Sequence, residues 1–175
     1  NGTVSIAAEA NATEGSRTAQ LSFSSFGTVR SATVTQRGQK RTWNEWKEDE
    51  ITSRDPDTDQ TGPNDSPAGD GIPNLLKYAT GLDPLKPCGS VVQVTAEEAG
   101  GDACLVLGWP VNPEATGIRH AVEASEDLQT WTETAEVKTE GKSSATFRDA
   151  VPMNAESPRR RFLRLKISRE GESPL

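Results

Sequence analysis

The chain has 175 residues, of which 33% are hydrophobic and 26% are charged, and its formal net charge is −7. This length allows one domain of ordinary size or two small ones, and the low apolar share disfavours a single large core. An acidic chain lacks the basic surface that nucleic-acid binding requires, and no apolar run is long enough to cross a bilayer. We therefore expect small, turn-rich units with neither a nucleic-acid partner nor a membrane span.

Residues 1–39 have the alternating pattern of antiparallel strands. Apolar side chains recur at every second position in three short runs, which are Val4, Ile6 and Ala8, then Ala19, Leu21 and Phe23, then Ala32 and Val34. Gly15 lies before the second run and Gly27 before the third. Period-two alternation broken by turn residues predicts an antiparallel sheet, but three strands with open edges are marginally stable alone. We therefore expect further strands to complete this sheet.

The same stretch resembles the second half of a BACON domain, an immunoglobulin-like sandwich attached to secreted bacterial enzymes and surface proteins. The resemblance rests on Asn11, on the Arg-Thr-Ala strand start at residues 17–19, and on the closing Val-Thr-Gln-Arg-Gly run at residues 34–38. The family's first half, with its Trp-bearing strand, is missing, so this unit is expected to be incomplete. The resemblance implies that the parent chain or another subunit supplies the missing strands, and that polysaccharide is a candidate partner.

Residues 40–87 are expected to connect this first unit to a second one. Nine acidic residues gather in the connector, namely Glu45, Glu48, Asp49, Glu50, Asp55, Asp57, Asp59, Asp65 and Asp70. Within this acidic run only Lys47 and Arg54 carry positive charge. Residues 52–71 are rich in Asp, Gly, Pro, Ser and Thr and have almost no apolar side chain, which predicts a loop.

Two short helices are expected to flank this loop. Thr42 and Glu45 have the spacing of a capping box, and the helix that they begin carries Trp43 and Trp46 on one face. One interpretation is that this face packs against a neighbouring domain, since aromatic side chains bury large areas. The other is that Trp43 and Trp46 form a sugar-stacking platform.

The second helix is predicted from its end signals. Asp70 is a suitable N-cap, Pro73 is tolerated in the first turn, and Gly81 occupies the position that follows a helix. Leu75 and Leu76 belong to its apolar face.

The same region contains a possible calcium site. The candidate ligands are Asp55, Asp57, Asp59, Asp70 and Asn74. Alternating acids supply the oxygens that calcium prefers, and the Asp-Gly-Ile-Pro-Asn run at residues 70–74 resembles the calcium loops of thrombospondin type 3 and dockerin-like repeats. The sequence departs from that pattern, because Lys77 replaces an acidic ligand and residues 60–69 interrupt the register. The alternative is that Asp70 caps its helix and the other acids form a solvated linker.

Residues 88–170 return to a strand pattern. The expected strands are Val91–Thr95, Cys104–Trp109, Ile118–Ala124, Trp131–Val137, Ser144–Arg148 and Phe162–Ile167. Six short strands with turn-rich joins predict a small antiparallel sandwich, and residues 171–175 are expected to form a tail. The predicted fold class is therefore mainly β, with two small antiparallel immunoglobulin-like sandwich units, the first incomplete, joined by an acidic linker with two short helices.

The connector and second unit together resemble a C-terminal module that is frequent in exported proteins of Verrucomicrobia and related bacteria. The matching runs are Gly-Ile-Pro-Asn-Leu-Leu-Lys-Tyr-Ala at residues 71–79, Gly-Leu-Asp-Pro at 81–84, Val-Glu-Ala-Ser at 122–125 with Trp131, and Arg-Phe-Leu-Arg-Leu at 161–165. The resemblance implies an architectural role outside the cell, on its surface or in secreted form, rather than a reaction.

Few residues of the chain fit catalytic or zinc-binding templates. An even pair of cysteines, Cys88 and Cys104, suggests a disulfide in an exported module, with two free buried thiols as the alternative. His120 is the only histidine, so a zinc site lacks ligands. His120 shares a strand face with Ile118 and Val122, which predicts a packed, hydrogen-bonded histidine. No Gly-x-Ser-x-Gly run is present for a serine nucleophile.

These observations leave three functional hypotheses. The first is a non-catalytic accessory region that serves as spacer or anchor for a functional domain preceding it. The second is a carbohydrate-binding module of a secreted polysaccharide-degrading enzyme, which an exposed aromatic pair would favour. The third is the cleaved tail of a large secreted hydrolase whose catalytic part lies elsewhere.

Overall fold

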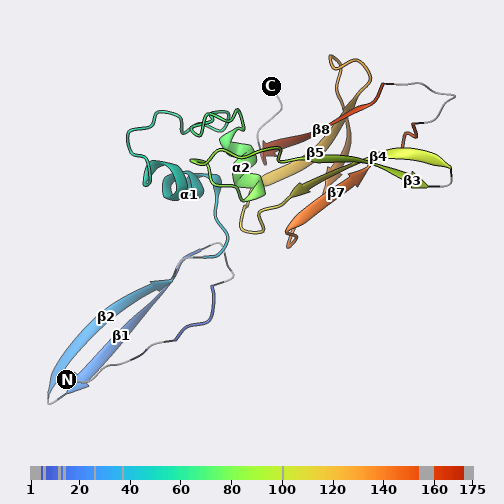
Figure 1. Cartoon of the computed structure of the whole chain (residues 1–175). Helices are drawn as coiled ribbons and strands as arrows, with labels where there is room; N and C mark the ends of the chain where they lie inside the picture. Colours follow the sequence, from blue (N-terminus) through green and yellow to red (C-terminus); the bar gives the residue numbers. More distant parts are fainter. Residues whose placement is uncertain are drawn as a thin grey trace.

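The computed structural model describes residues 5, 7–11, 13, 15–25, 27–36, 38–99, 101–153 and 160–171. Within these residues the chain forms eight strands and two short α-helices, and all named strand pairs are antiparallel. Figure 1 shows a long hairpin that projects away from a helical region and a C-terminal pair of sheets. The predicted fold class, mainly β with a small antiparallel sandwich, is confirmed.

The projecting hairpin consists of β1 (Arg17–Ser25) and β2 (Thr28–Gln36). Arg17 pairs with Gln36 at one end and Ser25 with Thr28 at the turn, so the ladder runs without a register shift. Alternation places five apolar side chains on one face, namely Ala19, Leu21, Phe23, Ala32 and Val34. Phe23 and Val34 remain 39% and 38% exposed. No described element covers this face, and Figure 1 shows the hairpin apart from the other strands.

The C-terminal unit contains two three-stranded sheets. One has the order β3-β4-β7 and the other has the order β6-β5-β8. The six elements are β3 (Gln93–Ala99), β4 (Asp102–Pro110), β5 (Ile118–Ser125), β6 (Thr132–Val137), β7 (Ser144–Arg148) and β8 (Phe162–Arg169). These positions confirm all six strands that the sequence predicted in this region, with ends that differ by a few residues.

Both sheets contribute to one core. Leu107 and Trp109 of β4 pack with Val122 of β5 and Ala145 of β7, and all four are nearly or fully buried. Partly buried apolar residues of β6, β7 and β8 add to this cluster. Alternating inward-facing side chains from two sheets are the defining feature of a sandwich core.

The connector has a separate core. Helix α1 (Trp43–Lys47) continues into the wider turn η1 (Glu48–Thr52), and helix α2 (Asn74–Thr80) follows after an irregular loop. The buried members of the cluster are Trp43, Trp46, Ile51 and Tyr78. Ala115 and Ile118 also pack against it, so the connector lies directly on the segment that enters β5.

Three sequence predictions of local structure have clear outcomes. The Thr42–Glu45 capping box is present at the start of α1. Gly81 ends α2 in the left-handed conformation, with φ of 75°. Asp70, however, does not cap α2, which begins after Pro73 without a side-chain cap. Of the first predicted strand, Val4 and Ile6 lie outside the described residues and Ala8 is not in a strand.

Candidate functional site

The most connected polar site in the described part of the chain is the joint between the connector and the C-terminal sandwich. Its centre is the phenol of Tyr78 on α2, whose side chain is fully buried. The hydroxyl donates to the carbonyl oxygen of Arg41 at 2.5 Å and accepts from the backbone N–H of Thr116 at 2.9 Å. Burial raises the pKa of Tyr78, so the phenol stays protonated and can donate. One side chain thus joins three segments that are far apart in sequence.

Backbone pairing reinforces this joint. Arg41 N donates to Glu114 O at 2.8 Å, and Thr116 N donates to Arg41 O at 3.2 Å. These bonds form a short parallel bridge between Arg41 and Ala115. Asn112 ties the same loop to α2, because its N–H donates to Ala79 O at 2.9 Å and its Nδ2 donates to Tyr78 O at 2.9 Å.

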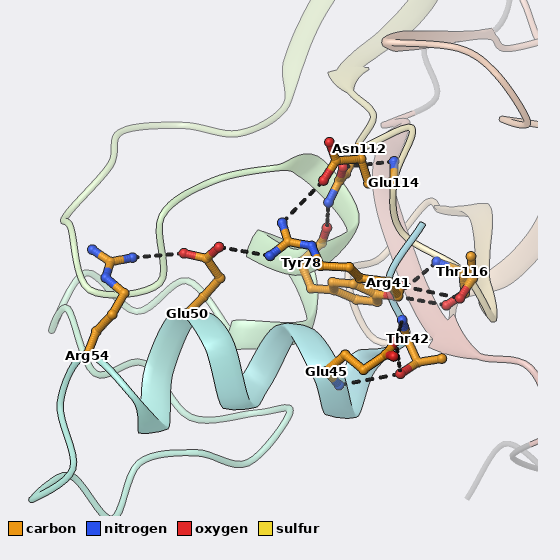
Figure 2. Close-up of polar contacts among 9 residues, drawn as sticks. All are labelled: Arg41, Thr42, Glu45, Glu50, Arg54, Tyr78, Asn112, Glu114 and Thr116. Carbon is orange, nitrogen blue, oxygen red and sulfur yellow. Dashed lines mark hydrogen bonds and ion pairs between the residues drawn. The ribbon is translucent and has the colours of Figure 1, made fainter. Parts of the chain in front are cut away.

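Charged side chains extend the joint across the connector. Figure 2 shows Glu50 between the guanidinium groups of Arg41 and Arg54, at 2.9 Å and 3.0 Å. Arg41 also reaches Glu114 at 3.3 Å, and Arg54 forms two bonds of 2.9 and 3.0 Å with Asp83. The Arg54 guanidinium lowers the pKa of Asp83 to about 2. The exposed pairs contribute little energy singly, but together they link the segment before α1, η1, the α2 exit and the β4–β5 loop.

The predicted sugar platform is not available in this structure. Trp43 and Trp46 are 7% and 2% exposed. Their ring centroids lie 5.4 Å apart, and each also contacts the ring of Tyr78, at 5.7 Å and 5.4 Å. The indoles pack mainly inside the connector itself, with Ile51 and Tyr78, and Ala115 and Ile118 at the sandwich side also pack against this cluster.

A second polar site lies at the far side of α2, around Lys77. Its ammonium is fully buried and contacts the carboxylate of Asp70 at 2.8 Å. It also donates to Lys86 O at 3.0 Å and to Pro84 O at 3.3 Å. Gly81 turns the chain back, so that the segment carrying these carbonyl groups runs beside the helix.

Asp70 is fully engaged by protein donors. Its Oδ1 accepts from Ser66 Oγ at 2.9 Å and from Ile72 N at 3.0 Å. Its Oδ2 accepts from Cys88 N at 3.0 Å in addition to Lys77. The bond from Lys77 is the main reason that the pKa of Asp70 is held well below its usual range.

The structure does not bring the predicted calcium ligands together. Asp57 and Asp59 are exposed and Asp55 is half-buried, whereas Asp70 is paired with Lys77. Asn74 is fully buried and its Nδ2 donates to Gln60 O and Gly62 O, while its Oδ1 has no hydrogen-bond partner. In the described part of the chain, no three His, Cys, Asp or Glu side chains lie close enough to hold a metal ion.

The predicted disulfide is not formed. Cys88 and Cys104 are both free cysteines in the structure. Cys88 lies in the irregular segment after α2, where its Sγ is 3.5 Å from Asp70 Oδ2, whereas Cys104 is buried in β4. The two cysteines therefore lie in different segments of the fold, and burial raises the pKa of Cys88.

His120 and Trp131 both take part in contacts within the sandwich. His120 is 4% exposed, and its Nδ1 accepts from Trp109 Nε1 at 3.1 Å, which confirms the packed, hydrogen-bonded histidine. Trp131 is partly buried, and the guanidinium of Arg164 lies 4.1 Å from its ring centroid. Arg164 is itself held by Glu123 at 2.8 Å, so a paired cation occupies one face of this indole.

The sequence pattern does not predict the joint. Tyr78 belongs to the run at residues 71–79, and no motif includes Arg41, Asn112 or Thr116. Two features of the sequence point to a buried role for Tyr78. It is the only tyrosine in the connector, and its spacing of three from Leu75 places both side chains on one helix face. The partners of Tyr78 lie 37 and 38 positions away, which no local pattern can indicate.

Comparison of the chain with protein-family models, with curated proteins and with solved structures returned no match. Among the described residues, no helix has both the length and the apolar character needed to cross a membrane.

Proposed function

We propose that this chain is a non-catalytic accessory region of a secreted or cell-surface bacterial protein, and that it holds a preceding domain in a fixed direction. The observation that carries the proposal is the joint around Tyr78. Because Arg41 is bonded to both Tyr78 and Thr116, the segment that leaves the hairpin is tied to α2 and to the entry of β5 at once. The connector and the sandwich then act as one rigid support rather than as two units joined by a flexible linker.

The proposed location outside the cell rests on the resemblance to exported bacterial modules. The carbohydrate-binding alternative is less well supported, since Trp43 and Trp46 are buried and the Arg164 guanidinium occupies one face of Trp131. We accordingly propose anchoring, not sugar capture, as the role of the module.

Limited proteolysis tests the rigid support directly. Residues 52–71 contain Arg54 and five aspartates, so both trypsin and an Asp-specific protease can cut an accessible form of this loop. We expect native protein to resist cleavage there until it unfolds, because Arg54 and Asp70 are engaged in ion pairs. Rapid cleavage between residues 52 and 71 under native conditions, with the sandwich left intact, would contradict the proposal.

We further propose that the apolar hairpin face is covered by strands from the preceding part of the parent polypeptide or from another subunit. Phe23 and Val34 leave a face that is costly to expose to water, and bare strand edges promote aggregation. Amide hydrogen exchange of residues 17–36 tests this in the intact source protein and in the isolated chain. Protection only in the intact protein is expected, whereas equally fast exchange in both would overturn the proposal.

A further inference from the structure

The surroundings of Lys77 resemble those of a bound cation. Lysine is almost never fully buried unless it is paired, yet its side chain is 0% exposed and that of Asp70 is 5% exposed. Its three oxygen neighbours are one carboxylate and two backbone carbonyls, at 2.8, 3.0 and 3.3 Å. An ammonium has three N–H donors, so each donor has one oxygen.

The charge balance of this cage defines the cation that it fits. Among the described residues, Asp70 is the one carboxylate paired with the ammonium, and its oxygens also accept from Ser66, Ile72 and Cys88. The carboxylate balances a single positive charge, and the two carbonyl oxygens accept the remaining N–H donors. Calcium requires six to eight oxygen ligands, so three oxygens suit an ammonium-type ion and not a divalent metal.

We propose that residues 66–88 form a cation-binding cage whose resident cation is the chain's own Lys77 ammonium, and that removal of this side chain opens a site for a free alkylammonium ion. The cage fastens the acidic loop, through Asp70, to the segment that leaves α2, through Pro84 and Lys86. An internal cation makes this fastening independent of calcium in the surroundings.

The decisive experiment is chemical rescue of Lys77→Ala. Loss of one partner from a buried ion pair is strongly destabilising, and we expect the melting temperature to fall by about 10 °C. Ethylammonium chloride, at an ionic strength matched with tetraethylammonium chloride, should restore part of that loss. The double variant Asp70→Asn with Lys77→Ala lacks the carboxylate and should gain nothing from ethylammonium. Equal responses of the two variants, or rescue by calcium chloride alone, would overturn the proposal.

The unchanged protein provides a second test if Lys77→Ala does not fold. A caged ammonium exchanges its protons with water slowly, so one lysine NH₃⁺ signal should be visible by ¹H–¹⁵N spectroscopy at neutral pH. That signal should be absent from Lys77→Arg, which keeps the positive charge but lacks an ammonium group. In addition, EDTA should leave the melting temperature of the unchanged protein within about 1 °C. A wild-type spectrum that shows only rapidly exchanging ammonium groups would contradict the cage.

Discussion

Tyr78 and His120 are buried polar side chains whose contribution depends on their hydrogen-bond partners. Removing a partner from a buried group costs more than the bond itself contributes, because the group left behind remains desolvated. Tyr78 is bonded to backbone groups of Arg41 and Thr116. His120 is bonded to the indole of Trp109. The two side chains therefore allow separate tests of the joint and of the sandwich core.

Tyr78→Phe should weaken the joint without disturbing the aromatic cluster. The ring and its packing against Trp43 and Trp46 are retained, while Thr116 N loses its better acceptor. We expect the free energy of unfolding to fall by about 2 kcal/mol, as measured by urea denaturation. Ser22→Ala, which removes an exposed hydroxyl from the hairpin, is the matched control and should change stability by less than about 0.5 kcal/mol.

His120 makes the stability of the sandwich depend on pH. Burial lowers the pKa of His120 from 6.5 to about 4, so the folded protein favours the neutral imidazole. The stabilisation is complete above pH 6.5 and is lost as the pH falls towards 4, with an upper size of about 3 kcal/mol.

Urea denaturation between pH 7 and pH 4 checks this dependence. His120→Gln keeps an acceptor for Trp109 but does not titrate, so its stability should decline less over this range. Carboxylates with lowered pKa values, such as Asp83 and Glu123, also begin to lose their stabilisation as the pH approaches 4. They are present in both proteins, so the difference between the two curves reports His120. Parallel curves for the two proteins would show that His120 is not the titrating group.

At the scale of elements, α1 depends on its first turn. The helix proper spans only five residues, and isolated helices of this length are unstable in water. The capping box supplies two local bonds, with Glu45 Oε2 accepting from Thr42 N at 2.9 Å and Thr42 Oγ1 accepting from Glu45 N at 3.4 Å. The wider turn η1 then carries the fully buried Ile51 into the connector core.

Thr42→Ala should therefore destabilise the connector by about 1 kcal/mol, because it removes the hydroxyl that accepts from Glu45 N. Thr42→Ser keeps the hydroxyl and should retain nearly all of the stability. Thermal unfolding monitored by tryptophan fluorescence measures both variants. An alanine variant as stable as the serine variant would show that tertiary packing alone holds α1.

For the whole molecule, the important division lies between the hairpin and everything after Arg41. The connector and the sandwich have separate cores, but the joint around Tyr78 binds them together. No comparable joint ties the described part of the hairpin to these two cores. At its base, Gln39 N donates to Asn11 O at 2.8 Å, a bond within the N-terminal part of the chain. No described helix or later strand packs on its apolar face.

Deletion of residues 1–38 should consequently leave the rest of the fold intact. We expect the melting temperature of the shortened chain to remain within about 2 °C of the full chain, since neither core loses a member. Differential scanning calorimetry should also show one transition for the connector and the sandwich, because the joint couples them. A drop of more than about 5 °C, or two separate transitions, would contradict this division.

The sequence by itself determined the local structure of this protein. Period-two alternation gave the six C-terminal strands, and spacing of Thr42 and Glu45 gave the start of α1, because these signals depend on neighbouring residues. Only the tertiary structure decided the roles of Tyr78, Lys77 and Asp70. The side-chain partners of Tyr78 and Lys77 lie between 7 and 38 positions away. The carboxylate of Asp70 has the same sequence signature whether it binds calcium, caps a helix or pairs with an ammonium. In the same way, only the tertiary structure shows that Trp43 and Trp46 belong to a core. The same pair of indoles would form an exposed platform if no other segment packed over them.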